Sequence, residues 1–184
     1  MADAAAGADA VLVAVPGPAV TDVLAAAGRL DGKIIIDAAN MMGQSRLSLR
    51  QLADACPAAR WVRAFNTLQA RVLADENHRL PRRVPFLSGD EQAKPAVVQR
   101  IEDAGFEPAD LGGIDDSQFQ EPGSALWNTA LESGDARALA ARVRAGHAEP
   151  AYPLTAPFEK LRDHAPATRS SSSSTCAARS SRPA

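Results

Sequence analysis

The sequence predicts an α/β fold with a doubly wound, mostly parallel sheet, followed by a disordered C-terminal tail. Continuous apolar runs at 11–15, 33–37 and 61–65 suit parallel strands that are covered on both faces. Segments with apolar residues at helical spacing separate these runs, which is the pattern of strand-helix-strand units. From residue 166 onward the chain is rich in serine and arginine, and it has too few apolar residues to offset the entropy of ordering.

The first strand-helix-strand unit spans residues 7–40. Pro16 ends its first strand, and Pro18 suits the first helical position, because an N–H group would have no helical partner there. The apolar face of the helix consists of Val20, Val23, Leu24 and Ala27. Gly28 marks the end of this helix, and the second strand leads directly into Asn40.

The middle of the chain continues the alternation of strands and helices. Ser48 and Gln51 have the spacing of a capping box, which predicts a helix up to about Cys56. The elements expected after it are a strand at 61–65, a short helix near 68–73, a solvated polar loop at 75–83, a strand at 84–87, a helix that begins at or just before Pro95, a strand at 106–111 and a last helix at roughly 124–132.

Composition and charge narrow the class of protein. The chain is 46% hydrophobic but only 4% aromatic, and its formal net charge is -2. Such a charge, without a concentrated basic patch, argues against a nucleic-acid or membrane partner. No apolar run is long enough to span a bilayer, so we expect a cytoplasmic protein. Cys56 and Cys176 have no second cysteine or histidine at metal-ligand spacing, which predicts neither a disulfide framework nor a metal site.

Five segments occur in an order that resembles a known family. They are ADAVLVAVP, KIIIDAAN, WVRAFNT, PFLSGDEQAK with IEDAGFEPADLGG, and EPGSALWN. Together they are similar to the NADP-dependent oxidoreductases that use the deazaflavin coenzyme F-420, over about residues 2–131. The resemblance implies a Rossmann-like domain that exchanges hydride between NADP(H) and the deazaflavin. Such domains hold the pyrophosphate with a glycine-rich turn, whereas no G-x-G-x-x-G occurs in these 184 residues.

The resemblance implies cofactor contacts at residues that follow the strands. Ala14, Val15 and Pro16 would lie against the nicotinamide end of NADP, and Asn40 would lie near its carboxamide or ring. Asn66 and Thr67 would border the deazaflavin or another acceptor. Ligands of open α/β sheets bind outside the carboxyl ends of the strands, where all of these residues fall. Each also has a purely structural interpretation, since the first three can simply end a buried strand and asparagines readily form turns.

Hydride moves directly between two cofactor rings in such an enzyme, so no residue is assigned an acid–base role and no metal is expected. The protein instead positions the rings and excludes water. Trp127 is interpreted as a packing residue, and Asp37 as a strand end that reaches solvent. A proline commonly follows the family's counterpart of Asn40, whereas this chain has Met41, which predicts a differently shaped loop.

We divide the chain into the C-terminal part of an oxidoreductase domain at 1–134, a weakly structured extension at 135–165 in which 136–145 has helical composition, and a disordered Ser/Arg-rich tail at 166–184. The sequence is expected to be truncated, beginning within the domain, so that the first strands of the sheet are absent and cofactor binding is impaired. The edge at 11–15 is then exposed.

Small-molecule redox cofactors are the expected partners, and the exposed edge allows a homo-oligomer. Two alternatives to a deazaflavin-dependent reductase remain open. One is a related Rossmann dehydrogenase or imine reductase, which would differ in its contacts to the substrate. The other is a non-catalytic interaction module, which would form a stable oligomer and bind no nicotinamide nucleotide.

Overall fold

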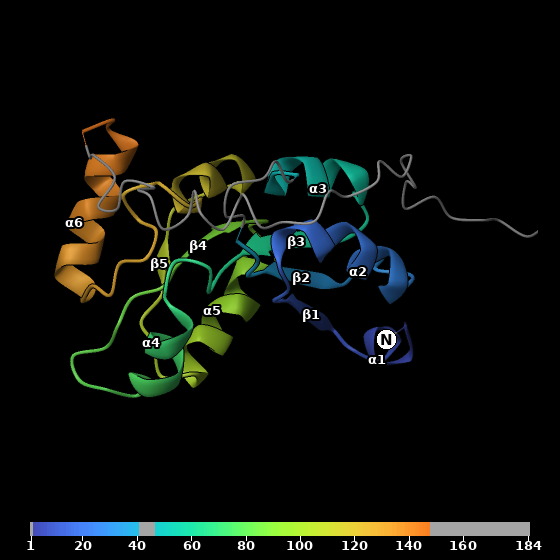
Figure 1. The fold of residues 1–184 in the computed structure, drawn as a ribbon, viewed down its shortest axis with the longest axis horizontal. Coiled ribbons are helices and arrows are strands. Elements are labelled where there is room, and N and C mark those ends of the chain that lie inside the picture. The colour runs from blue at the N-terminus through green and yellow to red at the C-terminus, as the bar shows by residue number, and fades with distance from the viewer. Residues whose placement is uncertain (1, 41–46, 148–184) are drawn as a thin grey trace, which may run out of the picture.

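The computed structural model describes residues 2–40 and 47–147. Helices and strands alternate along most of this chain (Figure 1). The elements are α1 (Ala2–Ala6), β1 (Ala10–Val13), the 3-10 helix η1 (Gly17–Ala19), α2 (Val20–Ala27), β2 (Ile34–Asp37), α3 (Leu49–Ala55), β3 (Arg60–Arg63), α4 (Ala70–Asp75), β4 (Phe86–Gly89), α5 (Lys94–Asp103), β5 (Ala109–Asp110), the 3-10 helix η2 (Ile114–Gln120) and α6 (Ser133–Arg144).

The strands form one five-stranded sheet in the order β1-β2-β3-β4-β5. Strands β1, β2 and β3 are parallel, β4 is antiparallel to β3, and β5 is parallel to β4. The predicted mixed α/β fold with a mostly parallel sheet is therefore confirmed. Because β1, β2 and β3 run in the same direction, the segments that leave them emerge at one edge of the sheet.

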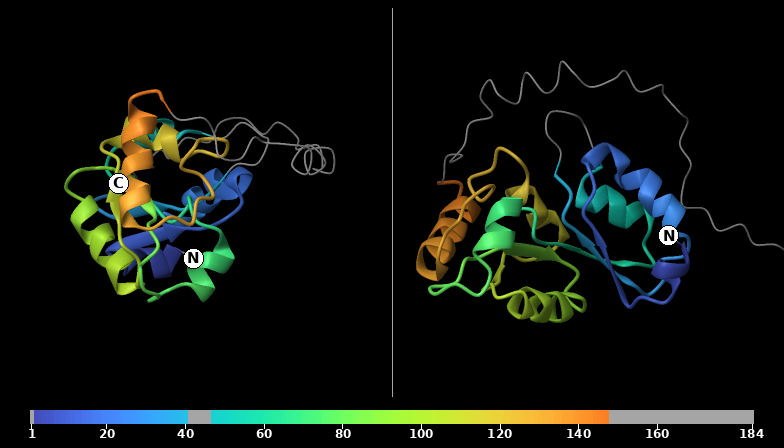
Figure 2. Two further views of the ribbon diagram at one scale, coloured as in Figure 1. Left: turned by 90° about the vertical axis from the view of Figure 1, so that its left-hand side faces the viewer. Right: turned by 60° about the horizontal axis from the view of Figure 1, so that its bottom comes forward.

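Helices cover both faces of the sheet (Figures 1 and 2). One face bears Val13, Ile35 and Trp61, which pack in a single core cluster with residues of α2 and α3. We call it the α3 face. The opposite face bears Ile36 and Val62, which pack against α4 and α5, and we call it the α5 face. Neighbouring residues of a strand point to opposite faces, so this alternation also assigns the strand-end side chains.

Among residues 2–40 and 47–147, strand β1 is covered on one face only. Val13, on the α3 face, is 2% exposed, whereas Leu12, on the α5 face, is 55% exposed. In the part of the chain that the structure describes, β1 also has a strand on one side only, because it lies at the end of the sheet. The expectation of an exposed apolar edge at 11–15 is thus confirmed.

A third core cluster lies at the opposite end of the sheet, around β4, β5 and α6. Ala136 and Ala140 of α6 are buried in it together with Phe86 and Leu126. The residues expected to form a weakly structured extension therefore open with a helix that is packed in the core. The tail predicted at 166–184 and the loop residue Met41 lie outside the described residues.

Several of the predicted boundaries are confirmed. Ser48 and Gln51 form the capping box of α3 through reciprocal hydrogen bonds. Helix α5 begins at Lys94, directly before Pro95, and α2 ends at Ala27, with Gly28 as its C-cap at a φ of 79°. The strand predicted at 84–87 is displaced by two residues, since β4 spans 86–89.

The helix predicted at 124–132 is wrong. This segment forms turns, and Asn128 has a φ of 61°, a left-handed conformation that a continuous right-handed helix excludes. Trp127 is nevertheless buried, as expected of a packing residue. Sequence periodicity also missed η2, which runs along the α3 face above β3 and β4 and contacts both strands.

None of the helices in 2–40 and 47–147 combines the length and apolar composition that a bilayer crossing requires. In the same residues, no group of three or more His, Cys, Asp or Glu side chains is arranged to hold a metal ion.

Candidate functional site

The carboxyl ends of the three parallel strands create the candidate site. Val13, Asp37 and Arg63, the last residues of β1, β2 and β3, are paired in one cross-strand row. The segments that follow them therefore leave the sheet side by side. All six predicted site residues lie in these segments, which is the edge where open α/β sheets bind their ligands.

A cavity of about 550 Å³ opens beside these strand ends on the α5 face. Ala14 and Asn40, two of the predicted residues, line it from β1 and β2. Its other lining residues come from the same strand ends, from the segment after β3 and from the neighbourhood of α5: Leu12, Ala38, Phe65, Leu68, Ala70, Leu73, Asn77, His78, Ala104 and Phe106. The volume is in the range of pockets for small organic ligands, and the lining is mostly apolar.

Phe65 shapes this cavity from the end of β3. It has a φ of 64°, a conformation that is uncommon for a residue with a bulky side chain. The turn that it makes separates β3 from Asn66, and Phe65 itself lines the cavity. Backbone strain of this kind is often found at ligand sites, where the surrounding packing maintains it.

Asn40 and Asn66 are joined directly. The Asn40 side chain donates from Nδ2 to the backbone oxygen of Asn66 at 2.8 Å, and Asn66 donates from Nδ2 to Asn40 Oδ1 at 3.1 Å. Neither residue has a positive φ, so neither serves as a left-handed turn former. The two side chains instead connect the ends of β2 and β3. Asn40 lines the cavity, whereas Asn66 lies behind it and is only 2% exposed.

The remaining predicted residues are not part of the cavity wall. Val15 is partly buried against the core of the α3 face, and exposed Pro16 precedes η1. Thr67 is fully buried, and its hydroxyl oxygen accepts a hydrogen bond from the backbone N–H of Phe86 in β4. The structure thus brings Ala14, Asn40 and Asn66 together and separates the other three from the cavity.

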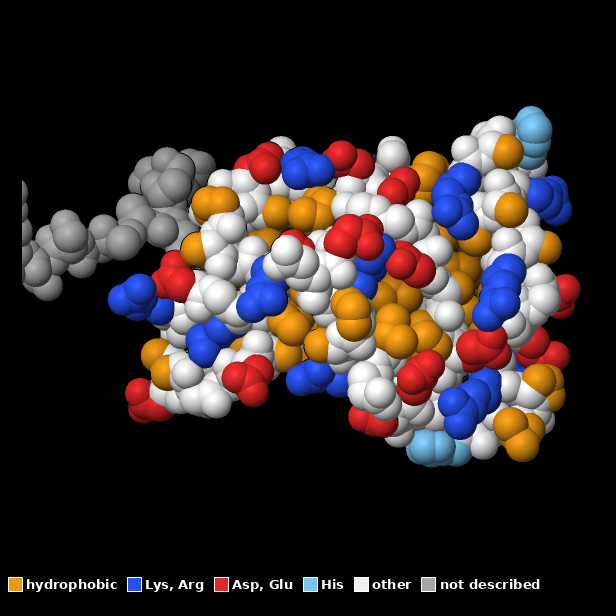
Figure 3. All heavy atoms as spheres, turned by 180° about the vertical axis from the view of Figure 1, so that it is seen from behind, with side chains coloured by type: hydrophobic (Ala, Val, Ile, Leu, Met, Phe, Trp, Pro, Cys, Tyr) orange, Lys and Arg blue, Asp and Glu red, His pale blue; other side chains and the backbone are white. Residues whose placement is uncertain are grey.

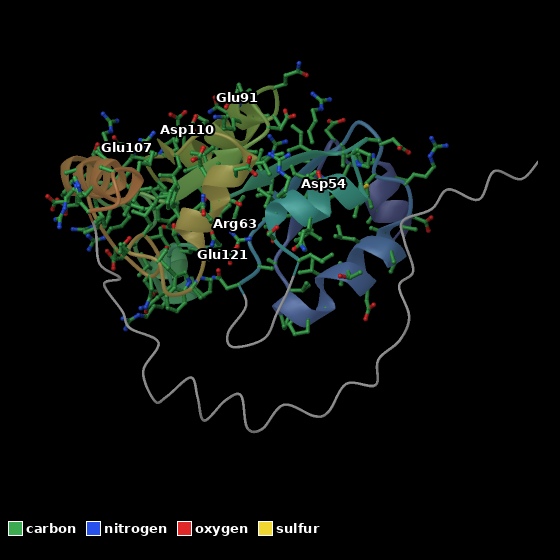
Figure 4. All side chains as sticks on the ribbon, turned by 90° about the horizontal axis from the view of Figure 1, so that it is seen from above. Asp54, Arg63, Glu91, Glu107, Asp110 and Glu121 are labelled. Carbon is green, nitrogen blue, oxygen red and sulfur yellow. The ribbon has the colours of Figure 1, made fainter. Side chains whose placement is uncertain are left out.

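A buried ion pair lies on the α3 face of the same strand ends. Arg63 donates to the Asp37 carboxylate at 2.6 Å, and both side chains are 0–1% exposed. Arg63 also donates to the backbone oxygen of Ala39 at 3.0 Å and to Glu121, just after η2, at 3.2 Å (Figure 4). The expectation that Asp37 reaches solvent is wrong, because β3 places a guanidinium beside it and η2 covers the pair.

No role for Gln120 was predicted from the sequence, although the residue contacts Asn66 after β3 and Phe86 in β4. Its buried side chain donates to Asn66 Oδ1 at 3.1 Å and to the backbone oxygen of Phe86 at 3.0 Å. Ser88 donates to Gln120 Oε1 at 2.5 Å. No motif in the polar run 115–121 indicates this role, since the contacts depend on the path of η2 across the sheet. The sequence offers one indirect signal: Arg63 is a charged residue within the apolar strand WVRAF, and a buried charge needs polar side chains around it.

The loop that carries His78 to the cavity is held by ion pairs. Arg79 and Arg83 both contact Glu76, at 3.2 and 2.7 Å, and both lie within 4 Å of Glu132. The hydrogen bond from Arg83, together with the positive charge of Arg83 and Arg79, lowers the pKa of Glu76 below its ordinary value. The segment 75–83, interpreted from its sequence as a solvated loop, is therefore tied to residues near the start of α6.

Three comparisons with known proteins agree with this architecture. The sequence profile of the family described as NADP oxidoreductase, coenzyme F-420-dependent, matches residues 1–41. The crystal structure of a hypothetical protein from Sinorhizobium meliloti is 33% identical, with a TM-score of 0.65, and the match covers 72% of this chain and 70% of that one. The structure of a proposed F-420-dependent NADP reductase from Arthrobacter sp. FB24 is 30% identical, with a TM-score of 0.56, and the match covers 64% and 60%.

Among curated sequences, the metalloreductase STEAP3 of Rattus norvegicus is 32% identical over 112 residues, which are 58% of this chain and 23% of that protein. The chain thus spans about a quarter of the curated relative that it matches. The strand order and these similarities define a Rossmann-like fold that is similar to NADP-dependent oxidoreductases. Residues 1–41 are similar to the family of coenzyme F-420-dependent NADP oxidoreductases, and the fold of the chain is similar to those of the two bacterial structures.

Proposed function

We propose that this chain forms the ring-binding part of an oxidoreductase that exchanges hydride between NADP(H) and the deazaflavin coenzyme F-420. The observation that carries the proposal is the position of Ala14 and Asn40 on one wall of the 550 Å³ cavity at the ends of two parallel strands. The match of residues 1–41 to the family profile and the similarity to the proposed F-420-dependent reductase support the choice of both cofactors.

The cavity suits flat, largely apolar rings. Leu12, Leu68 and Phe106 line it, and polar groups such as that of Asn40 are few. An apolar lining excludes water, which favours direct transfer of hydride between two held rings. The cofactors supply the hydride donor and acceptor, while the residues of this chain position the rings. We assign Ala14 to direct contact on the nicotinamide side, and Val15 and Pro16, which lie outside the cavity wall, to the support of this strand end. Asn66 and Thr67, which are also outside the wall, would support the acceptor side.

The test is a hydride-transfer assay with NADPH and oxidised F-420, followed by loss of the visible absorbance of the deazaflavin. Because the 184 residues contain no G-x-G-x-x-G motif, both cofactors are used at saturating concentration. We expect Asn40→Ala to lower the transfer rate by about a hundredfold, since ring misplacement by about an ångström has an effect of this size. The exposed Gln99 of α5 supplies the control, and Gln99→Ala should keep the wild-type rate.

Other outcomes identify the alternatives. Transfer to a cyclic imine but not to the deazaflavin would indicate a related imine reductase or dehydrogenase. If the chain neither binds the cofactors nor transfers hydride, the proposal that it is an enzyme is contradicted. If wild type and Asn40→Ala transfer hydride at the same rate, the cavity is not the place where the rings react.

A non-catalytic interaction module is the second candidate, and the exposed edge of β1 favours it. Leu12 is 55% exposed there, and an edge strand that bears an exposed apolar side chain can pair with a strand of another chain. Light scattering would test this candidate, since a second copy paired at β1 doubles the molar mass and Leu12→Lys should then restore the monomer. On the face shown in Figure 3, hydrophobic side chains gather centrally and basic and acidic side chains are mixed, which supports small-molecule or protein partners over nucleic acid.

A further inference from the structure

Three side-chain amides form a continuous chain from η2 to the cavity. Gln120 donates from Nε2 to Asn66 Oδ1 at 3.1 Å, and Asn66 donates from Nδ2 to Asn40 Oδ1 at 3.1 Å. Gln120 and Asn66 are buried, whereas Asn40 is half-buried and lines the cavity. The chain therefore connects the α3 face, where η2 lies, with the α5 face, where the cavity opens.

The orientation of each amide is set by a backbone carbonyl. Gln120 Nε2 faces the oxygen of Phe86 at 3.0 Å, Asn66 Nδ2 faces the oxygen of Gln120 at 2.7 Å, and Asn40 Nδ2 faces the oxygen of Asn66 at 2.8 Å. A carbonyl oxygen can only accept a hydrogen bond, so an amide nitrogen and not an amide oxygen must point to it. Reversing any one amide would bring two oxygens together at that carbonyl.

The number of donors then determines what remains for a ligand. An amide nitrogen has two N–H groups, and both are used at Gln120 and at Asn66. At Asn40 one N–H is used by the backbone oxygen of Asn66, and the other has no acceptor among residues 2–40 and 47–147. The amide chain thus ends, at the cavity, in a single uncommitted donor.

We propose that Gln120 is a positioning residue, which acts through Asn66 to make Asn40 present an N–H donor to the cavity. The subsite at Asn40 accordingly takes a carbonyl oxygen of a ring ligand. That this ring is a nicotinamide or a deazaflavin rests on the proposed function. The carboxamide of the first and the ring carbonyl of the second share this chemistry, and an amide presenting its oxygen instead would repel both.

Nuclear magnetic resonance of the nitrogen-labelled chain tests the proposal, because it detects weak binding at the side-chain amide of Asn40. The probes are the N-methylnicotinamide cation, oxidised F-420 and the N-methylpyridinium cation, which has the same ring and charge as the first but no carbonyl. We expect the carbonyl-bearing probes to shift the Asn40 amide signals and N-methylpyridinium to bind about tenfold more weakly than N-methylnicotinamide. A shift with only one of the two carbonyl-bearing probes identifies the ring that occupies the subsite.

The role of Gln120 is tested by Gln120→Met, with Gln118→Met as the matched control on the exposed side of η2. The first substitution should move the free-state Asn40 amide signals and remove the tenfold preference for the carbonyl, while the second should change neither. If Gln120→Met does not fold, Asn40→Asp takes its place, since a carboxylate of the same size has no N–H to offer. This variant should reverse the preference between the two cationic probes.

Equal affinities for the two cationic probes in the wild type, or an Asn40 signal that is indifferent to Gln120→Met, would overturn the proposal. So would absence of binding by both carbonyl-bearing probes. If the carbonyl preference is found but no hydride reaches F-420 in the enzymatic assay, the proposed function fails while the role of Gln120 stands.

Discussion

The ion pair between Asp37 and Arg63 gives the most direct test of the structural argument. The two side chains are 0–1% exposed, and the guanidinium lies 2.6 Å from the carboxylate. Asp37→Asn keeps the shape of the side chain but removes its charge. A buried guanidinium then remains beside a neutral amide, with the carboxylate of Glu121, 32% exposed, still at 3.2 Å. Breaking a buried pair in this way typically costs about 3 to 5 kcal/mol.

A surface pair in the same protein supplies the control. Arg50 and Asp115 meet at 2.8 Å, but their side chains are 48% and 72% exposed. Water screens such a pair, so Asp115→Asn should cost less than about 1 kcal/mol of unfolding free energy. The two substitutions are chemically identical and differ in burial, which isolates the effect of the protein interior.

Urea unfolding followed by tryptophan fluorescence measures both variants, because Trp61 is buried two residues before Arg63 in β3, on the same face of the sheet. We expect the midpoint of Asp37→Asn to fall well below that of Asp115→Asn at an unchanged slope. Equal midpoints would refute the reasoning and would mean that the strand-end charges are solvated. A double variant that replaces Asp37 by Leu and Arg63 by Met should recover part of the loss, since an apolar pair carries no desolvation cost.

Two further substitutions test other parts of the fold. Gly89→Ala should lower the melting temperature, because a Cβ atom there would lie 2.3 Å from the backbone oxygen of Trp61 and φ is +148°, whereas Gly134→Ala, with nothing within 4 Å, should keep or raise it. Glu76→Gln should lower the melting temperature at neutral pH, because hydrogen bonding to Arg83 lowers the pKa of Glu76. Because the pKa of Glu76 is lower in the folded protein, its carboxylate stabilises the fold at pH values above its ordinary pKa of 4.5, and this contribution is lost as the pH falls. The melting temperatures of wild type and Glu76→Gln should therefore converge in acid. A difference that stays constant with pH would contradict this prediction.

Local sequence signals were enough to locate most of the elements. The capping box at Ser48, the proline at the start of α5 and the three apolar runs depend on the backbone and on neighbouring side chains, and these act in the same way in any context. The convergence of Asn40 and Asn66 also follows from the sequence, because parallel strands end at a common edge. Element order and the approximate place of the site were therefore accessible before the fold was known.

Other features depended on which segments pack together. Asp37 and Arg63 are 26 positions apart, and only the register of β2 on β3 places their charges side by side. The segment around Asn128 forms turns in place of the predicted helix, and Trp127 is buried there. Gln120 has no local motif at all. Its role depends on η2 crossing the strand ends, where Gln120 orients the side-chain amides of Asn66 and Asn40. These residues are too far apart in sequence for any periodic pattern to indicate the contact.

The sequence alone thus determined the order of the strands and of most helices, and the polar residues at the strand ends, because short-range propensities and the geometry of parallel sheets decide both. The tertiary structure decided which of these residues face the cavity and which are buried behind it. Burial, register and the orientation of an amide are set by partners that are remote along the chain, and hydrogen-bond partners become identifiable only when those segments meet.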